Sequence, residues 1–350
     1  MMIFKVFGIA FGALIGIILL YLIIVIFAPG FNVAKQPFPI SESATKDRDN
    51  APAELVESVS FEVGGLKISG WLYLPENIPF PVPCIIMNHG FGGTKDVALE
   101  PYALRFRDVG IAVLTYDYRY FGESEGEPRQ LFSVASQLED CSAAIDYARK
   151  LKEIDPEKII IWGTSAGGGY GLVMAAKDRK IAGVIAQCSA LDSQEDGKVI
   201  LDREGIGFFL RLFMHAQRDK GRSRFGLSAH KIPIVGKSGS LAMLNAPGAF
   251  EGYAKLASAD FINEVCARAL LTSGGYNPID HAKDVRCPVL IQICENDNLV
   301  SKNSAFNTAK ILGEYAELKQ YPIGHFDIYL GENFEKAVHD QIEFLRKIFS

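Results

Sequence analysis

Cysteine and positive charge are both scarce in this sequence of 350 residues. Its six cysteines lack the dense spacing of a small disulfide-bonded protein, and three of them, Cys84, Cys188 and Cys294, lie in apolar runs, which favours buried free thiols. The 41 Asp and Glu residues outnumber the 36 Lys and Arg residues, so the net charge is −5. This charge argues against the broad basic surface of a nucleic-acid-binding protein, and we expect no nucleic-acid partner.

Metal- and phosphate-binding motifs are also missing. The sequence has no HExxH, no CxxC and no cluster among its six histidines, and neither GK[ST] nor GxGxxG accompanies its glycine-rich segments. We therefore expect neither a metal nor a cofactor.

Hydrophobic residues make up 49% of the chain, which excludes a disordered or collagen-like protein and suffices for a large core.

One long hydrophobic run lies at the N-terminus. The 23 residues from Val6 to Ala28 carry no charge, and at about 1.5 Å per residue a helix of this length would cross a hydrocarbon core of about 30 Å. We expect residues 1–28 to be a transmembrane anchor. The alternative is a cleaved signal peptide, but its apolar region is typically only about 7–15 residues long, and a good cleavage site is missing.

Residues 29–54 have the composition of a tether, because they are rich in Pro, Ser, Asn and charge without periodicity. The positive charges on the two sides of the anchor are nearly balanced. The very short N-terminal tail favours an extracytoplasmic position for the rest of the chain. The sequence thus predicts a single-pass membrane protein whose main domain spans residues 55–350.

Short apolar runs alternate with amphipathic helices in this main domain. The helical periodicity is clearest at residues 101–109 and 134–151. The strand-like runs are 58–63, 66–74, 84–87, 111–116, 159–162, 184–188, 289–294 and 317–321. Strand, helix, strand in this order predicts an α/β fold with a mostly parallel, doubly wound sheet covered on both faces.

The alternation is interrupted once, between about residues 192 and 278. We expect a mainly helical cap there, with helices at 207–217, 249–257 and 262–271. The segment 198–237 holds nine Lys or Arg and three acidic residues, a local net charge of +6. Together with the apolar stretch 206–214, this charge predicts either an apolar cap helix packed over the functional site with a solvated basic tail, which we favour, or a surface that contacts anionic lipid beside the anchor.

A serine in a tight turn is the first candidate for chemistry. The motif Gly163-Thr-Ser-Ala-Gly167 follows a strand-like run and precedes an Ala/Gly-rich helix. Glycines two positions before and after Ser165 relieve the crowding of such a strand-to-helix turn, which exposes the serine above the sheet. We therefore interpret Ser165 as a nucleophile rather than as a helix N-cap.

A serine nucleophile needs a base to take its proton and a carboxylate to orient that base. His325 lies in a loop between the last strand-like run and the C-terminal helix, and Asp297 follows the preceding strand. Glu295 is a second candidate for the acid, and we favour Asp297.

A glycine-rich loop completes the set. His89-Gly-Phe-Gly-Gly93 follows a strand-like run, and the Phe91 N–H of this loop can stabilise an oxyanion together with the Ala166 N–H. We expect His89 to support the loop. We also expect Asp117, Arg119 and Glu123 to brace the nucleophile region, and Glu139 and Asp140 to be solvated on their amphipathic helix.

With Ser165, Asp297 and His325 in this order, residues 55 to 350 resemble the α/β-hydrolase superfamily. Within it, the sequence is similar to bacterial hydrolases of the X-Pro dipeptidyl-peptidase-like and dienelactone-hydrolase-like groups. The resembling segments are HGFGGTKD (89–96), 102–127 with AVLTYDYRYFGES, WGTSAGG (162–168), IPIVGKSGSL (232–241), CPVLIQICEND (287–297) and PIGHFDIYLGENFE (322–335). Dehalogenases and epoxide hydrolases of the superfamily carry Asp at the position of Ser165, so the resemblance disfavours their chemistry.

From these features we expect a membrane-tethered, carboxylesterase-like serine hydrolase. It would cleave a hydrophobic ester through an acyl-enzyme on Ser165, with His325 as base, Asp297 as acid and the Phe91 and Ala166 N–H groups as oxyanion donors. Two alternatives stay open. One is a peptidase or amidase of the same fold, and the other is a non-catalytic, membrane-anchored binding protein.

Overall fold

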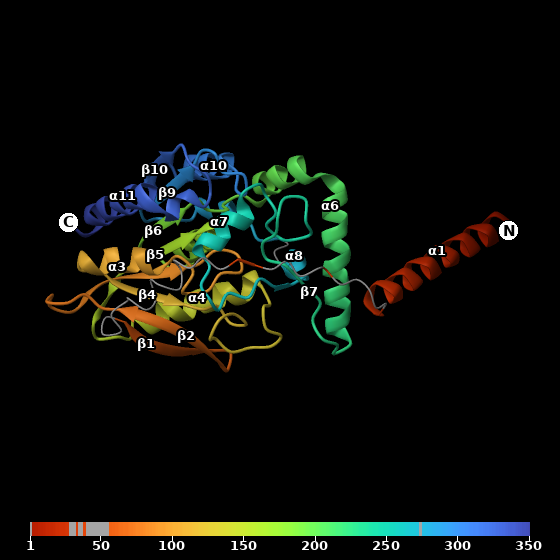
Figure 1. Ribbon diagram of the computed structural model, residues 1–350, viewed down its shortest axis with the longest axis horizontal. Coiled ribbons are helices and arrows are strands. Elements are labelled where there is room, and N and C mark those ends of the chain that lie inside the picture. The colour runs from red at the N-terminus through yellow and green to blue at the C-terminus, as the bar shows by residue number, and fades with distance from the viewer. Residues whose placement is uncertain (1, 28–32, 34–37, 40–55, 273–274) are drawn as a thin grey trace.

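The computed structural model describes residues 2–27, 33, 38–39, 56–272 and 275–350, with only the backbone for residues 2–10. A twisted sheet lies at the centre, with helices on both of its faces (Figure 1). Helix α1 (Met2–Phe27) projects away from the rest of the chain, and the long helix α6 (Ser193–Arg224) lies at the side from which α1 departs.

The sheet has eight strands in the order β1-β2-β4-β3-β5-β6-β9-β10. β1 pairs with β2, and β2 with β4, in antiparallel fashion, whereas all neighbouring strands from β4 to β10 run parallel. The bounds are β1 (Glu57–Val63), β2 (Leu66–Tyr73), β3 (Val82–Asn88), β4 (Ala112–Tyr116), β5 (Ile154–Thr164), β6 (Ile181–Gln187), β9 (Val289–Cys294) and β10 (Ala316–Tyr321). The predicted α/β fold with a mostly parallel, doubly wound sheet is therefore confirmed.

Helices cover both faces because the central strands are apolar on both faces. In β3, Ile85 and Met87 belong to the core formed with α3 and α11, whereas Cys84 and Ile86 belong to the core formed with α4 and α5. This alternation follows from the two-residue period of a strand. The helix bounds are α3 (Glu100–Asp108), α4 (Val134–Ala148), α5 (Gly168–Lys177), α10 (Lys302–Leu312) and α11 (Gly331–Phe349).

All six cysteines are free and buried, which confirms the prediction of buried thiols. Asp140 contradicts its prediction. It lies on α4 but is completely buried, and its carboxylate accepts hydrogen bonds from the Arg119 backbone N–H (2.9 Å) and from Arg119 Nε (2.6 Å). Burial raises the pKa of Asp140 to about 6 against the opposing effect of Arg119. The partner comes from a distant loop, so the helical pattern could not reveal it.

The cap follows β6 and contains more than helices. Its elements are α6, β7 (Lys231–Ile232), α7 (Ala249–Leu256), β8 (Val265–Cys266), α8 (Ala269–Thr272) and α9 (Ile279–Ala282). The predicted helix at 262–271 is wrong except for its last three residues, which lie in α8, because β8 pairs with β7 and the Cys266 N–H bonds to the Gln130 carbonyl. Helix α6 is longer than predicted and is broken at Gly205, which has φ +72°.

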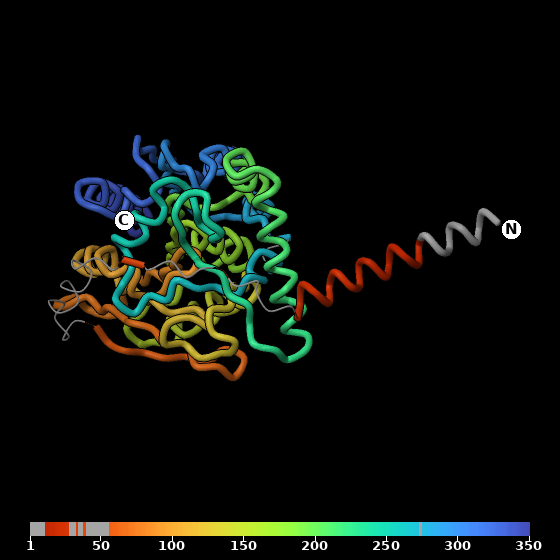
Figure 2. Tube along the Cα trace, turned by 45° about the vertical axis from the view of Figure 1, so that its right-hand side comes forward, coloured from red at the N-terminus to blue at the C-terminus, as the bar shows by residue number. Residues whose placement is uncertain are grey.

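Helix α1 agrees with the predicted helical run, but its predicted role is unsupported. In the part of the chain that the structure describes, no helix has both the length and the apolar character needed to cross a membrane. The last turn of α1 packs on α6 (Figure 2): Arg218 Nη1 donates to the Val25 carbonyl at 2.5 Å, and the rings of Phe27 and Phe225 are 5.4 Å apart. The predicted tether at 29–54 lies outside the described residues, apart from residues 33, 38 and 39.

Candidate active site

Ser165 lies where β5 ends and a single 3₁₀ turn (Ser165–Gly167) leads into α5. Its φ is +53°, in the left-handed region that non-glycine residues rarely adopt. A Cβ on Gly163 would overlap the Gly167 carbonyl, and a Cβ on Gly167 would overlap the His89 and Asn88 carbonyls. Glycine is therefore required on both sides of the serine, as the motif predicts.

The structure joins His325 to Asp297. His325 follows β10 in a loop, Asp297 follows β9, and His325 Nδ1 lies 2.6 Å from Asp297 Oδ2 with both side chains 4% exposed. The other carboxylate oxygen of Asp297 accepts the backbone N–H groups of Leu299 (2.8 Å) and Val300 (2.9 Å). These bonds fix the carboxylate plane. Glu295, the second candidate acid, is exposed.

The environment of His325 favours its protonated form. Burial lowers the pKa of His325, but the Asp297 carboxylate opposes this effect and prevails, with a further contribution from Cys188, so the pKa is raised to about 9. In its neutral form, which predominates above about pH 9, a histidine held in this way can accept a proton from a nearby hydroxyl, because the imidazolium that forms is stabilised.

Ser165 and His325 line one cavity of about 40 Å³, which also touches the predicted oxyanion loop. The rest of its lining is largely apolar, with contributions from the cap. The apolar lining residues are Phe91, Val97, Ala98, Leu244, Tyr253, Leu256, Phe326 and Tyr329. The site is thus a narrow, largely apolar cavity lined by both Ser165 and His325.

The oxyanion loop is held in place by its neighbours. The Phe91 ring lies 4.5 Å from the Phe132 ring, and the Phe91 carbonyl accepts the Tyr253 hydroxyl at 3.2 Å. His89 is buried, and its Nδ1 bonds to the Gly90 carbonyl at 3.0 Å. Ala166 follows Ser165 at the N-terminal end of the helical segment, where backbone N–H groups have no intrahelical partner.

Asp117 lies behind this loop, as expected for a bracing residue. Its carboxylate accepts the Lys95 backbone N–H and the Lys95 ammonium, both at 2.7 Å, and the Glu123 backbone N–H at 3.0 Å. These bonds tie the loop after β3 to the loop after β4. Asp117 is 1% exposed and does not line the Ser165 cavity.

Comparisons with known proteins show the family to which the chain belongs. A sequence profile described as "alpha/beta hydrolase fold" matches residues 83–211. The "Quorum-quenching protein AidA" of Acinetobacter baumannii is 40% identical to the chain over 305 residues, which are 87% of this chain and 98% of that protein. The chain belongs to the α/β-hydrolase superfamily.

Other relatives of this α/β hydrolase carry hydrolase names. The "Thiohydrolase apmlB" of Arthrinium phaeospermum is 28% identical over 313 residues, which cover 85% of this chain and 98% of that protein. The crystal structure of the alpha/beta hydrolase GrgF from Penicillium sp. superposes with a TM-score of 0.68 at 25% identity, covering 83% of this chain and 98% of GrgF. These comparisons support hydrolase activity, while the similarity to the X-Pro and dienelactone groups stays a prediction.

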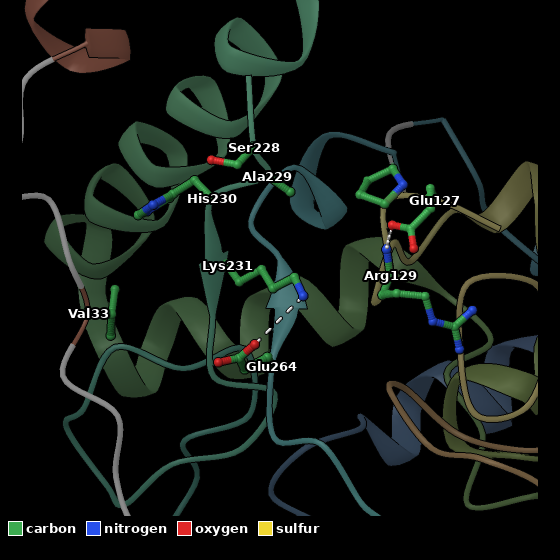
Figure 3. Close-up of a pocket in the computed structure, with 9 residues that line it drawn as sticks. Val33, Glu127, Arg129, Ser228, Ala229, His230, Lys231 and Glu264 are labelled. Atoms are coloured by element: carbon green, nitrogen blue, oxygen red, sulfur yellow. Dashed lines mark hydrogen bonds and ion pairs between the residues drawn. The ribbon is translucent and has the colours of Figure 1, made fainter. Parts of the chain in front are cut away.

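A larger cavity, of about 750 Å³, lies at the base of the cap and shares no lining residue with the Ser165 cavity. Figure 3 shows Lys231 of β7 and Glu264 facing each other within it, and their charged atoms are 3.7 Å apart. In the described part of the hydrolase, no group of three His, Cys, Asp or Glu residues could hold a metal ion. We therefore place the candidate active site at Ser165.

Sequence reasoning predicted a cap over the site but did not identify the cap residues that take part in it. Leu244, Tyr253 and Leu256 line the Ser165 cavity, and Asp196 of α6 contacts the loop that carries Asp297. A short amphipathic pattern marks α7, but which of its residues face the serine depends on how the cap folds back over the sheet. No local signal in the sequence carries that information.

Proposed function

We propose that this α/β hydrolase is a serine hydrolase that cleaves carboxylic esters through an acyl-enzyme on Ser165. The observation that supports it most is the hydrogen bond between His325 and Asp297 beside a cavity that also holds Ser165, a serine in a left-handed turn. A non-catalytic binding protein would have no need for a strained serine in the same cavity as a histidine whose pKa is raised.

In the proposed reaction, His325 takes the proton of the Ser165 hydroxyl while Ser165 Oγ attacks the acyl carbonyl carbon. The Phe91 and Ala166 N–H groups bind the oxyanion of the tetrahedral intermediate. The C–O bond to the alcohol then breaks, and His325 gives its proton to the leaving oxygen. Water attacks the acyl-enzyme by the reverse sequence of proton transfers and releases the acid.

The lining of the cavity supports an ester with an apolar acyl or aryl group. Phe91 and Phe326 flank the serine, and Leu244 and Leu256 come from the cap. Burial of apolar substrate groups against such side chains contributes roughly 25 cal/mol per Å². A charged acyl group would lose its hydration without an oppositely charged partner among these lining residues.

A panel of p-nitrophenyl esters, the matching anilides and X-Pro amides tests the substrate class. We expect the esters to be hydrolysed at least about tenfold faster in kcat/KM than the anilides and X-Pro amides, because p-nitrophenolate leaves more readily than the nitrogen of an amide. The same acyl chains attached as thioesters form a third arm. Faster turnover of amides would favour the peptidase, and faster turnover of thioesters would give this hydrolase a thioesterase assignment instead.

We further propose that α1 attaches the hydrolase to a membrane, with the domain on the extracytoplasmic side. Support comes from the exposed apolar side chains of α1, such as Ile17 and Leu20, and from those of α6, including Ile206, Leu210 and Phe213. On α6 these three residues share one face, and the basic residue Arg211 is exposed on the same helix.

Full-length protein carrying Ile17→Asp and Leu20→Asp tests the attachment. We expect wild type to float with vesicles containing anionic lipid and the double variant to stay largely in the bottom fraction, because each buried charge opposes insertion. Arg211→Gln, which removes a charge from the cap and leaves α1 unchanged, is the comparison for the double variant. Wild type that stays with the bottom fraction would rule out attachment, and protease added to intact cells would show the side on which the domain lies.

A further inference from the structure

The first half of α6 forms hydrogen bonds to the loop that carries Asp297, the candidate catalytic acid. This loop runs from Asp297, after β9, to Ser301, the N-cap of α10. Asp196 Oδ1 accepts the Ser301 backbone N–H at 2.8 Å, and Arg203 Nη1 donates to the Asn298 carbonyl at 2.6 Å. Two side chains from one cap helix thus hold the loop at two points.

Asp196 is a buried carboxylate that is only partly hydrogen-bonded. The residue is 9% exposed, and among the described residues its second carboxylate oxygen, Oδ2, has no hydrogen-bond partner. Burying an incompletely paired carboxylate costs stability, and groups of this kind gather at functional sites. The Ser301 N–H alone is a weak reason to place a carboxylate here, since an asparagine would accept the same bond.

The electrostatic surroundings link Asp196 to the His325–Asp297 pair. Burial and the negative charges of Asp192 and Asp297 raise the pKa of Asp196 to about 7, although the Ser301 N–H lowers it. Asp196 in turn helps to raise the pKa of His325, alongside Asp297 and Cys188. Because 7 lies below the value of about 9 for His325, Asp196 is charged in the pH range where His325 loses its proton.

We propose that Asp196 is a positioning residue for catalysis, which holds the Asp297 loop through the Ser301 N–H and places a second negative charge near His325. The basicity of His325 then depends on how α6 docks on the sheet domain. The break at Gly205 separates this docking half of α6 from the half that packs on α1. The inference rests on the proposed function of Ser165 and His325.

Asp196→Asn separates the charge from the hydrogen bond, because the asparagine amide oxygen can still accept the Ser301 N–H. Loss of the charge makes the imidazolium of His325 less stable, so the pKa of His325 falls. We expect the acidic limb of the pH–rate profile to move to lower pH by roughly half a unit or more, and the plateau rate to fall several-fold. Asp196→Ala, which removes both features, is expected to lower the plateau by a further factor of about ten.

The rate at which a fluorophosphonate labels Ser165, measured between pH 5 and 10, provides the profile without any assumption about the substrate. Asp202→Asn, an exposed carboxylate on the same helix, is the matched control and should leave the limb unchanged. Thermal unfolding of each variant is recorded alongside.

The possible outcomes distinguish the two proposals. No labelling of wild-type Ser165 would defeat the proposed function itself. Labelling with the same acidic limb in wild type, Asp196→Asn and Asp202→Asn would overturn the role of Asp196 while leaving the serine mechanism intact. Unfolding of Asp196→Asn but not of Asp202→Asn would also overturn it, by showing that Asp196 is purely structural.

Discussion

Replacing Ser165 by alanine is expected to lower kcat for the best ester substrate by about 10⁴–10⁶-fold. The hydroxyl is the nucleophile that forms the acyl-enzyme in the proposed reaction, and the oxyanion donors that remain can only assist direct attack by water on the ester. Stability should change little, because a small side chain is removed at an already strained position. The measurement is the steady-state rate of ester hydrolysis, with circular dichroism to confirm the fold.

Ser223→Ala is a suitable control, because Ser223 is exposed near the end of α6 and outside the cavity. It should retain full activity. A Ser165→Ala variant that is folded and keeps more than about a tenth of the wild-type kcat would contradict the acyl-enzyme mechanism. Contaminating esterases are excluded if both variants are purified in the same way.

Asp297→Asn is expected to lower kcat by about 10⁴-fold, because an asparagine amide can donate to the imidazole and hold it in the wrong tautomer. The asparagine Oδ1 can still accept the Leu299 and Val300 N–H groups, so the loop should stay in place. The pKa of His325 should also fall, since its main stabilising charge is lost. Steady-state kinetics across the pH range measure both effects.

Glu295→Gln is the matched control for Asp297→Asn, because it makes the same change two residues away on an exposed side chain. We expect its activity to stay within about twofold of wild type. If Glu295→Gln were the inactive variant and Asp297→Asn the active one, the role of the acid would pass to Glu295, and the hydrogen bond seen to His325 would have no catalytic meaning.

The sequence sufficed for those features whose cause is local. The positions of the central strands could be predicted because β3 and its neighbours are apolar on both faces. The glycines around Ser165 are required by backbone crowding within one turn. The choice of Asp297 over Glu295 as the partner of His325 agrees with the geometry, because the side chain that lies past the strand end is the one that reaches the histidine loop.

Features that depend on distant contacts could not be predicted in this way. From the sequence, Asp140 is expected to be a solvated helix residue. In the structure it bonds to Arg119, which lies in a loop 21 residues earlier in the chain. The segment 262–271 has the apolar content of a helix, but β8 within it pairs with β7 and the Glu264 carbonyl accepts a bond from Gln130, so only its end, in α8, is helical. Asp196 belongs to the same class, because its partner Ser301 lies 105 residues away.

Mass-spectrometric mapping of a fluorophosphonate adduct shows directly whether Ser165 is the nucleophile. We predict a single adduct on the peptide that contains Ser165, formed at a rate that rises with pH as His325 loses its proton. The adduct should disappear in Ser165→Ala and form far more slowly in Asp297→Asn. An adduct on another residue, or full ester hydrolysis by protein that carries no adduct at Ser165, would contradict the assignment of Ser165 as the nucleophile.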